Sequence, residues 1–174
     1  MTVVIRDLAD SDVAEVVTLS LRAWEPVFAS FGAVLGPAVY RHLYPDWSRS
    51  QAAAVERVCR DPAMRVRVAD EDGRRVGFVA VVVHDESFDE PDSGEVEMLA
   101  VDPAAQRRGI GRALLDDGVE QLRRSGVRIV AIGTGGDPGH APARRTYEAA
   151  GFTPLPLVRY YRLLAPDGES PPTP

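Results

Sequence analysis

The chain has 174 residues, of which 45% are hydrophobic, and this is enough apolar material for one domain with a buried core. The formal net charge of −6 argues against general binding to nucleic acid or to anionic membranes, because both would be repelled at long range. The lone cysteine, Cys59, leaves no intramolecular disulfide, and we find neither a signal-peptide pattern nor an apolar run of bilayer length. We therefore expect a cytoplasmic protein.

The first half of the chain predicts a strand, two or three helices and a β-hairpin. Residues 2–8 alternate as a strand, and the run 10–12 offers an N-cap for a helix that Pro26 ends. One or two further helices follow over 28–61, with breaks at Gly32, Gly36-Pro37 and Pro45. The hairpin has strands over 64–69 and 75–84, joined by the turn sequence Asp70-Glu71-Asp72-Gly73.

The second half begins with an acidic loop over 85–94, which lacks the spacing of a calcium loop and is interpreted as a solvated loop. After it the pattern predicts a strand over 95–101, a helix, a strand over 128–134, and a helix over 141–150 that Gly151 ends. A final strand over 157–163 could pair across a homodimer. We expect one domain over 1–165 and a disordered tail over 166–174.

The helix after residue 101 opens on a glycine-rich turn that has the chemistry of an anion site. The first N–H groups of a helix have no intrahelical partner and lie at the positive end of the helix dipole. Gly109 and Gly111 have no Cβ, so a diphosphate could approach the main chain, and Arg107, Arg108 and Arg112 add positive charge. We interpret this turn as a pyrophosphate cradle.

Two common nucleotide-binding loops do not match this turn. A P-loop requires a lysine, and this chain contains none. The dinucleotide fingerprint requires Gly or Ala three residues after Gly111, where Leu114 stands, and this counts against an NAD-dependent oxidoreductase.

The run Gln106-Arg107-Arg108-Gly109-Ile110-Gly111, preceded by Leu99-Ala100-Val101-Asp102-Pro103, resembles the acyl-CoA motif of the GCN5-related N-acetyltransferases (GNATs). A second element of that family resembles the stretch 143–152, which reads Ala-Arg-Arg-Thr-Tyr-Glu-Ala-Ala-Gly-Phe. The resemblance implies a mixed α+β fold, with a mostly antiparallel twisted sheet of six to seven strands and about four helices. It also implies direct acetyl transfer from acetyl-CoA to a primary amine, without a metal.

The resemblance implies a set of cofactor-binding residues on the strand, the turn and the helix, with one more before the last helix. They are Leu99, Ala100, Val101, Gln106, Arg107, Arg108, Gly109, Ile110, Gly111, Arg112 and His140. The backbone amides of Leu99 and Val101 resemble those that hold the pantetheine arm as if it were another strand. His140 stands where many members of the family have an asparagine, and it could bond the pantetheine, cap the helix or serve as a base.

Amide formation needs a base for the amine, because an alkyl ammonium has a pKa of about 10.4, and an acid for the departing thiolate. Glu95 and Glu97 are the candidate bases, since residues two apart on a strand point to the same side, and a bulge could re-aim either one. We favour Glu97, which is nearer the motif. Tyr147 stands where the resembling family has a tyrosine that protonates sulfur.

The acceptor is the open question, and small-molecule amines and peptide amines both remain candidates. In the resembling family residues 28–61 cover the acceptor site, and Trp24, Phe28 and Tyr44 could hold a cation against their ring faces, although aromatics at helical spacing are more often core. A non-catalytic acyl-CoA-binding or sensing module of the same fold is the alternative function.

Overall fold

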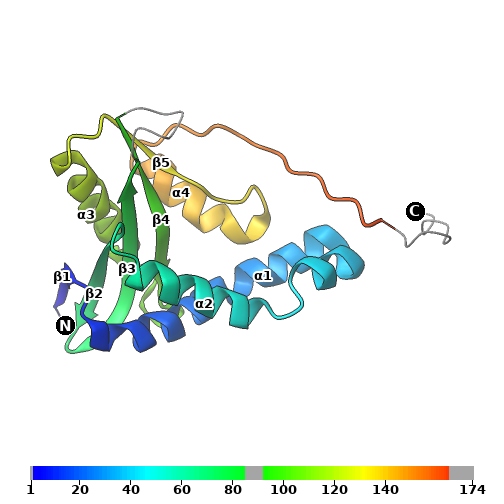
Figure 1. Cartoon of the computed structure of the whole chain (residues 1–174), viewed down its shortest axis with the longest axis horizontal. Coiled ribbons are helices and arrows are strands. Elements are labelled where there is room, and N and C mark those ends of the chain that lie inside the picture. Colours follow the sequence, from blue (N-terminus) through cyan, green and yellow to red (C-terminus); the bar gives the residue numbers. More distant parts are fainter. Residues whose placement is uncertain (1, 85–91, 165–174) are drawn as a thin grey trace.

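The computed structural model describes residues 2–84 and 92–164 and has a mixed α+β architecture (Figure 1). Five strands form one sheet in the order β1-β2-β3-β4-β5: β1 Val3–Asp7, β2 Arg65–Glu71, β3 Arg74–Val83, β4 Ser93–Val101 and β5 Ile129–Ile132. The first four strands run antiparallel to their neighbours, whereas β5 runs parallel to β4. The predicted fold class is confirmed, although the described residues form five strands rather than six or seven.

Helices cover both faces of this sheet (Figure 1). They are α1 Val13–Leu43, α2 Trp47–Arg60, α3 Ile110–Arg124 and α4 Ala141–Ala149. Strand β3 is buried on both sides: Phe78 and Ala80 belong to the core under α1 and α2, whereas Val79 and Val81 belong to the core under α3. Among the described residues, none of the helices combines the length and apolarity needed to cross a bilayer.

The predicted hairpin turn joins β2 to β3. Asp72 and Gly73 both have positive φ, 52° and 86°, as a two-residue turn of the primed type requires. Asp70 lies at the entry to this turn and accepts a hydrogen bond from the Gly73 N–H at 2.8 Å. The turn is therefore fixed by its own sequence.

Helix α1 does not end at Pro26, as the sequence predicted, but continues to Leu43. Val27 and Phe28 are buried directly after the proline, and this packing offsets the missing N–H. The backbone leaves helical geometry only at Gly36, with φ 72° and ψ 162°. The break falls there because the residue before Pro37 cannot easily be helical and glycine tolerates a positive φ.

The predicted final strand over 157–163 is absent from the described part of the chain, where residues 152–164 have no regular secondary structure. Figure 1 shows this segment leaving the domain beside β5 and α4 and extending outward. Alternating side chains give a strand only where an edge is within reach, and this segment meets none in the single chain. The predicted tail over 166–174 and most of the acidic loop lie outside the described residues.

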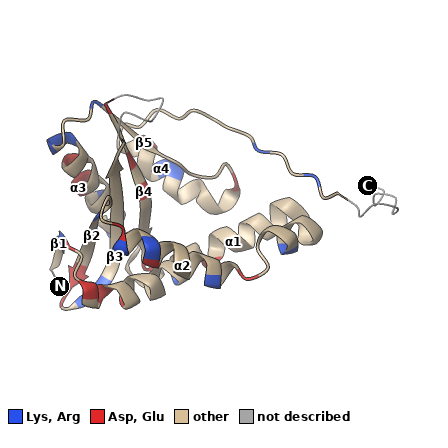
Figure 2. Cartoon of the chain, in the orientation of Figure 1, with Lys and Arg blue, Asp and Glu red and all other residues tan. Residues whose placement is uncertain are grey.

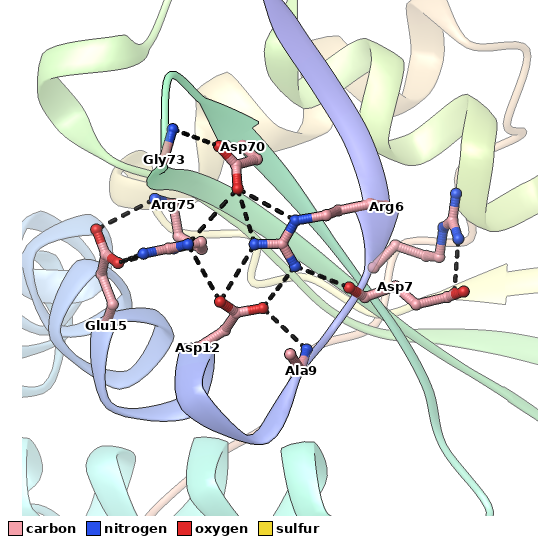
Figure 3. A network of polar contacts seen from close by, with 9 residues as sticks. Arg6, Asp7, Ala9, Asp12, Glu15, Asp70, Gly73 and Arg75 are labelled. Carbon is pink, nitrogen blue, oxygen red and sulfur yellow. Dashed lines mark hydrogen bonds and ion pairs between the residues drawn. The ribbon is translucent and has the colours of Figure 1, made fainter.

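A network of ion pairs ties β1 and β2 to the start of α1 (Figure 3). Arg6 bonds Asp12 at 2.6 Å and Asp70 at 2.8 Å, and Arg75 bonds Glu15 at 2.5 Å. The Asp12 carboxylate is almost fully buried, and Figure 2 shows acidic and basic residues side by side at this end of the sheet. Because every carboxylate here has a cationic partner, we interpret the network as structural.

Candidate active site

A cleft of about 740 Å³ opens where β4 and β5 separate. The two strands pair only from Ser93 and Ile129 to Val96 and Ile132. Beyond that point β4 continues to Val101, while the chain after β5 turns away, so the two strands form the walls of a V. The cleft is completed by α1, the start of α3, and α4.

The free side of β4 carries backbone N–H groups that face the cleft. The Asp102 N–H donates to Val76 O of β3 at 2.9 Å, so the alternation of a strand turns the N–H of Ala100 toward β3 as well. The N–H groups of Leu99 and Val101 consequently face the other side, and both residues line the cleft. An extended ligand could bond there as an additional strand does.

The glycine-rich turn forms the mouth of the cleft. Arg107 and Gly109 both adopt left-handed backbone conformations, with φ of 60° and 82°, and the Gln106 side-chain amide donates to Val101 O at 3.0 Å. A Cβ at Gly111 would meet only one methyl of Val101, at 3.5 Å. The first turn of α3 is thus open toward the cleft, as an anion site at a helix N-terminus requires.

The arginines near this turn differ in their surroundings. Arg107 and Arg112 line the cleft, and Arg112 also donates to Ala149 O of α4 at 2.7 Å. Arg108, predicted from the sequence as a cofactor ligand, lies outside the cleft and pairs with Glu71 of β2. This pairing holds the pKa of Glu71 below its usual range. The sequence motif could not reveal the partner, because β2 is distant in the chain.

The α4 side of the cleft adds a cation that the sequence analysis did not select. Arg145 lines the cleft together with Pro142 and Ala149. The signal was available, because residues three and four apart share a face of a helix and Arg145 lies four residues before Ala149. Ile110, predicted as a cofactor residue, is instead buried in the core under α3.

Of the two candidate glutamates, Glu97 is the extra residue of a β-bulge in β4, whereas Glu95 is paired. Ala80 pairs with Met98 and Val81 with Val96, so Glu97 has no partner on β3. Glu97 is exposed and lines the cleft. Glu95 does not line it and lies 3.5 Å from His84 Nε2. The two carboxylates therefore have different surroundings, as the sequence analysis allowed for a bulge in this strand.

Tyr147 lines the cleft from α4 and is packed against Phe152, with ring centroids 6.3 Å apart. Gly151 has a φ of 91° and ends α4 as predicted, and the Phe152 N–H returns to Tyr147 O at 3.1 Å. The helix end therefore positions the tyrosine. Burial raises the pKa of Tyr147 to about 12, so its phenol keeps its proton across the physiological range.

His140 also lines the cleft, and its Nδ1 lies 2.5 Å from Asp137 Oδ1. Burial alone would raise the pKa of Asp137, but the bonds from Ser30 and His140 hold it below its usual range. A carboxylate on Nδ1 fixes the imidazole and leaves Nε2 as the second ring nitrogen. The imidazole does not cap α4, which was one of the expectations for it.

The family model described as "Acetyltransferase (GNAT) family" matches residues 32–152. The chain belongs to the GNAT family. This membership removes the alternative of an NAD-dependent oxidoreductase.

One curated relative and two solved structures illustrate what this GNAT chain is similar to. Mycothiol acetyltransferase from Sanguibacter keddieii is 45% identical over 87 residues, which are 49% of this chain but 27% of that protein. The chain therefore spans less than a third of the length of that relative. PaiA N-acetyltransferase from Thermoplasma acidophilum, solved in complex with coenzyme A, has a TM-score of 0.65 at 16% identity over 88% of this chain and 91% of that chain. AAC(6')-Iy in complex with the bisubstrate analogue CoA-S-monomethyl-acetylneamine has a TM-score of 0.64 at 18% identity over 95% of this chain and all (100%) of that chain.

The α1 side of the GNAT cleft is mostly apolar. Trp24, Pro26 and Val27 line it, and Trp24 packs edge-on against Phe78 at 6.3 Å. Phe28 and Tyr44 do not line the cleft. Their rings contact each other 5.4 Å apart, and Phe28 is buried whereas Tyr44 is half-buried.

The described part of the chain offers little support for a metal site or for a cysteine nucleophile. No three His, Cys, Asp or Glu side chains there are grouped so that they could hold a metal ion. Cys59 is partly buried beside the core under α1 and α2, and burial raises its pKa to about 11, so it is a poor thiolate nucleophile.

Proposed function

We propose that this GNAT chain transfers the acetyl group of acetyl-CoA directly to a primary amine of a small molecule. The observation that carries the proposal is the convergence of three features in one cleft. Backbone N–H groups line its β4 wall, the glycine turn opens at its mouth, and Glu97 and Tyr147 lie on its walls. Family membership supplies the reaction class, and the residues supply the roles below.

The cleft fits acetyl-CoA by its shape and by its donors. We propose that the N–H groups of Leu99 and Val101 bond the pantetheine arm, so that it continues the sheet beside β4. The diphosphate would bind at the first turn of α3, beside Gly109 and Gly111, with Arg107 as a nearby countercharge. This arrangement directs the thioester toward the bulge at Glu97.

The chemistry needs one proton acceptor and one proton donor. We assign the acceptor role to Glu97, which takes a proton from the incoming ammonium either directly or through a water. The neutral amine attacks the thioester carbonyl, a C–N bond forms and the C–S bond breaks. Tyr147 then donates its proton to the departing sulfur, and its raised pKa keeps that proton available. The amide nitrogen gives up its second proton, which returns the Tyr147 phenolate to phenol directly or through water.

His140 is a second base candidate that the structure favours by one specific observation. The bond from Nδ1 to Asp137 resembles the arrangement of a histidine held by a carboxylate, with Nε2 left to accept a proton. It lines the same cleft as Glu97, at the start of α4. Separate substitution of Glu97 and His140 distinguishes the two assignments.

The acceptor is proposed to be a small amine that carries positive charge. The apolar wall around Trp24 and Val27 can hold a carbon skeleton, while the Glu97 carboxylate attracts an ammonium. The likeness to mycothiol acetyltransferases and to AAC(6')-Iy makes their acceptors the first to test. Polyamines, amino acids and a peptide N-terminus complete the panel.

The alternative function is a non-catalytic acyl-CoA-binding or sensing module, and it predicts binding of acetyl-CoA without turnover.

The test begins with calorimetric titration of CoA and acetyl-CoA into the wild type and into two variants of Gly111. Gly111→Trp fills the mouth of the cleft, and we expect binding to weaken at least about 100-fold. Gly111→Ala is the matched control, because its Cβ would meet only an ordinary 3.5 Å contact and binding should stay.

The same samples are then assayed for thiol release with the amine panel. Turnover with any acceptor, lost in Gly111→Trp, supports the proposal. Binding of CoA without turnover on every amine favours the sensing module. Unchanged binding in Gly111→Trp would refute the placement of the diphosphate on α3.

A further inference from the structure

The loop between β5 and α4 carries a polar pair, Asp137 and His140, whose side chains are only 7% and 15% exposed. Arg144 of α4 fixes the main chain of this loop, because its guanidinium donates to Gly135 O at 2.5 Å and to Asp137 O at 2.9 Å. The pair is therefore held from the helix that follows it and differs from an exposed ion pair, whose geometry water can loosen.

The Asp137 carboxylate accepts hydrogen bonds from three sides. His140 Nδ1 lies 2.5 Å from Oδ1, and the Gly139 N–H donates to Oδ2 at 3.0 Å. The Ser30 hydroxyl of α1 is a further donor to this carboxylate, and Ser30 Oγ accepts from the same Gly139 N–H at 3.0 Å. These bonds tie the loop to α1 and leave the carboxylate no freedom to turn.

The carboxylate also decides the tautomer of a neutral His140. Because ionised Asp137 can only accept, Nδ1 must carry the ring proton and Nε2 must carry the lone pair. No described residue bonds Nε2, and the described residues include no buried side-chain nitrogen or oxygen without a partner, so Nε2 is open to the cleft that His140 lines. The neutral imidazole thus presents a hydrogen-bond acceptor to the cleft.

This acceptor lies beside the apolar α1 wall of the cleft. The His140 ring contacts Phe31 of α1, with ring centroids 5.5 Å apart. A Cβ at Gly139 would meet Val27 Cα at 3.0 Å, so the loop packs directly on α1. Val27 lines the cleft together with Trp24 and His140. A carbon skeleton held by this wall would consequently lie next to the imidazole.

We propose that His140 Nε2 accepts a hydrogen bond from a second donor on the amine substrate, either a hydroxyl or an amine that is not acetylated. Asp137 is then a positioning residue that acts through His140. The inference rests on the proposed function, in which Glu97 takes the proton of the reacting amine and Nε2 is left without a donor. A substrate that fills the cleft displaces water from Nε2, and an acceptor atom buried without a donor lowers affinity. The site should therefore prefer amino alcohols and diamines to simple alkyl amines.

Gly135 provides a way to separate the pair without changing either member. A Cβ at Gly135 would lie 2.5 Å from His140 Nδ1 and would also overlap Asp137 Oδ1, so alanine there must displace the two side chains. The neighbouring Gly136 has nothing within 4 Å of its Cβ position, and its φ is not positive. Gly136→Ala is therefore the matched control for Gly135→Ala.

The kinetic test measures kcat/KM for butylamine, aminobutanol and diaminobutane, which share a carbon chain and differ in the second donor. For the wild type and Gly136→Ala we expect values at least about tenfold higher for the two substrates with a second donor. In Gly135→Ala and Asp137→Asn the three values should fall within about threefold of one another. Calorimetric binding of acetyl-CoA should be unchanged in all three variants, which a general collapse of the cleft would not allow.

A second test reads the tautomer in the resting protein from the ring nitrogen resonances of neutral histidine. Loss of a signal in His140→Gln identifies His140 among the three histidines of the chain. The wild type should carry the proton on Nδ1. In Asp137→Asn the amide oxygen stays on the fixed Gly139 N–H, so the amide N–H faces His140 and the ring proton moves to Nε2.

Three outcomes would overturn the inference. One is a neutral wild-type His140 with its proton on Nε2. Another is a wild type that acetylates butylamine as efficiently as the two other amines. The last is an equal loss for all three amines in Asp137→Asn, which would make His140 the base. Absence of turnover with every amine would instead refute the proposed function, and the tautomer would still decide whether Asp137 positions His140.

Discussion

Replacing Glu97 by glutamine tests the assignment of the base most directly. The substitution keeps the shape and the hydrogen-bonding reach of the side chain but removes its capacity to accept a proton. Glu95→Gln is the matched control, because it makes the same chemical change on the same strand. The bulge is at Glu97, which lines the cleft, while Glu95 is paired with β3 and lies beside His84.

The expected loss follows from the setting of the carboxylate. A positioned general base contributes about 10²- to 10⁴-fold, or about 2.7–5.4 kcal/mol of barrier. Glu97 is exposed in an open cleft, so water can relay part of the proton transfer. We therefore expect the lower part of this range, about 10²- to 10³-fold in kcat for Glu97→Gln, and less than about threefold for Glu95→Gln.

The assay is steady-state thiol release with the best amine of the panel, alongside calorimetric binding of acetyl-CoA. Binding should be unchanged in both glutamine variants, because neither side chain belongs to the proposed diphosphate or pantetheine contacts. Near-wild-type turnover in Glu97→Gln, together with a large loss in His140→Gln, would transfer the role of base to the histidine held by Asp137. Equal losses in Glu95→Gln and Glu97→Gln would refute the reasoning from the bulge.

Two further predictions concern protonation. We assign Tyr147 the role of acid, and burial raises its pKa to about 12, so kcat should not fall between about pH 8 and 10. Tyr147→Phe should lower kcat about 10- to 100-fold with little change in the KM for acetyl-CoA. A fall in wild-type kcat centred near pH 10 that the phenylalanine variant lacks would contradict this assignment. Bonds from Arg6 hold the pKa of Asp12 below its usual range, so this carboxylate stabilises the fold above about pH 4 and the stabilisation is lost as the pH falls through the lowered value. In urea unfolding at neutral pH, Asp12→Ala should lower the free energy of unfolding by about 2–4 kcal/mol, and this difference should shrink in acid. Glu56→Ala, at an exposed ion pair on α2, is the control and should lower it by less than about 0.5 kcal/mol. Equal losses for the two variants would show that the network in Figure 3 is not structural.

The local chemistry of the chain determined several features by itself. The turn at Asp72 and Gly73 follows from residues that tolerate positive φ, and the end of α4 follows from Gly151 for the same reason. The open first turn of α3 follows from Gly109 and Gly111, which also carry the family resemblance. In each case neighbours in the sequence supply the whole physical cause, so no distant contact was needed.

Other features depended on residues that are far apart in the chain. Arg108 lies outside the cleft because Glu71 comes beside it from β2. Helix α1 continues past Pro26 because the residues that follow are buried, with Phe28 packed against the ring of Trp47 from α2. Glu97 has no partner on β3, and this local change in register determines that Glu97 lines the cleft. The sequence marked residues 157–163 as strand-forming, but a strand needs a neighbouring edge, and only the tertiary arrangement determines whether one is within reach.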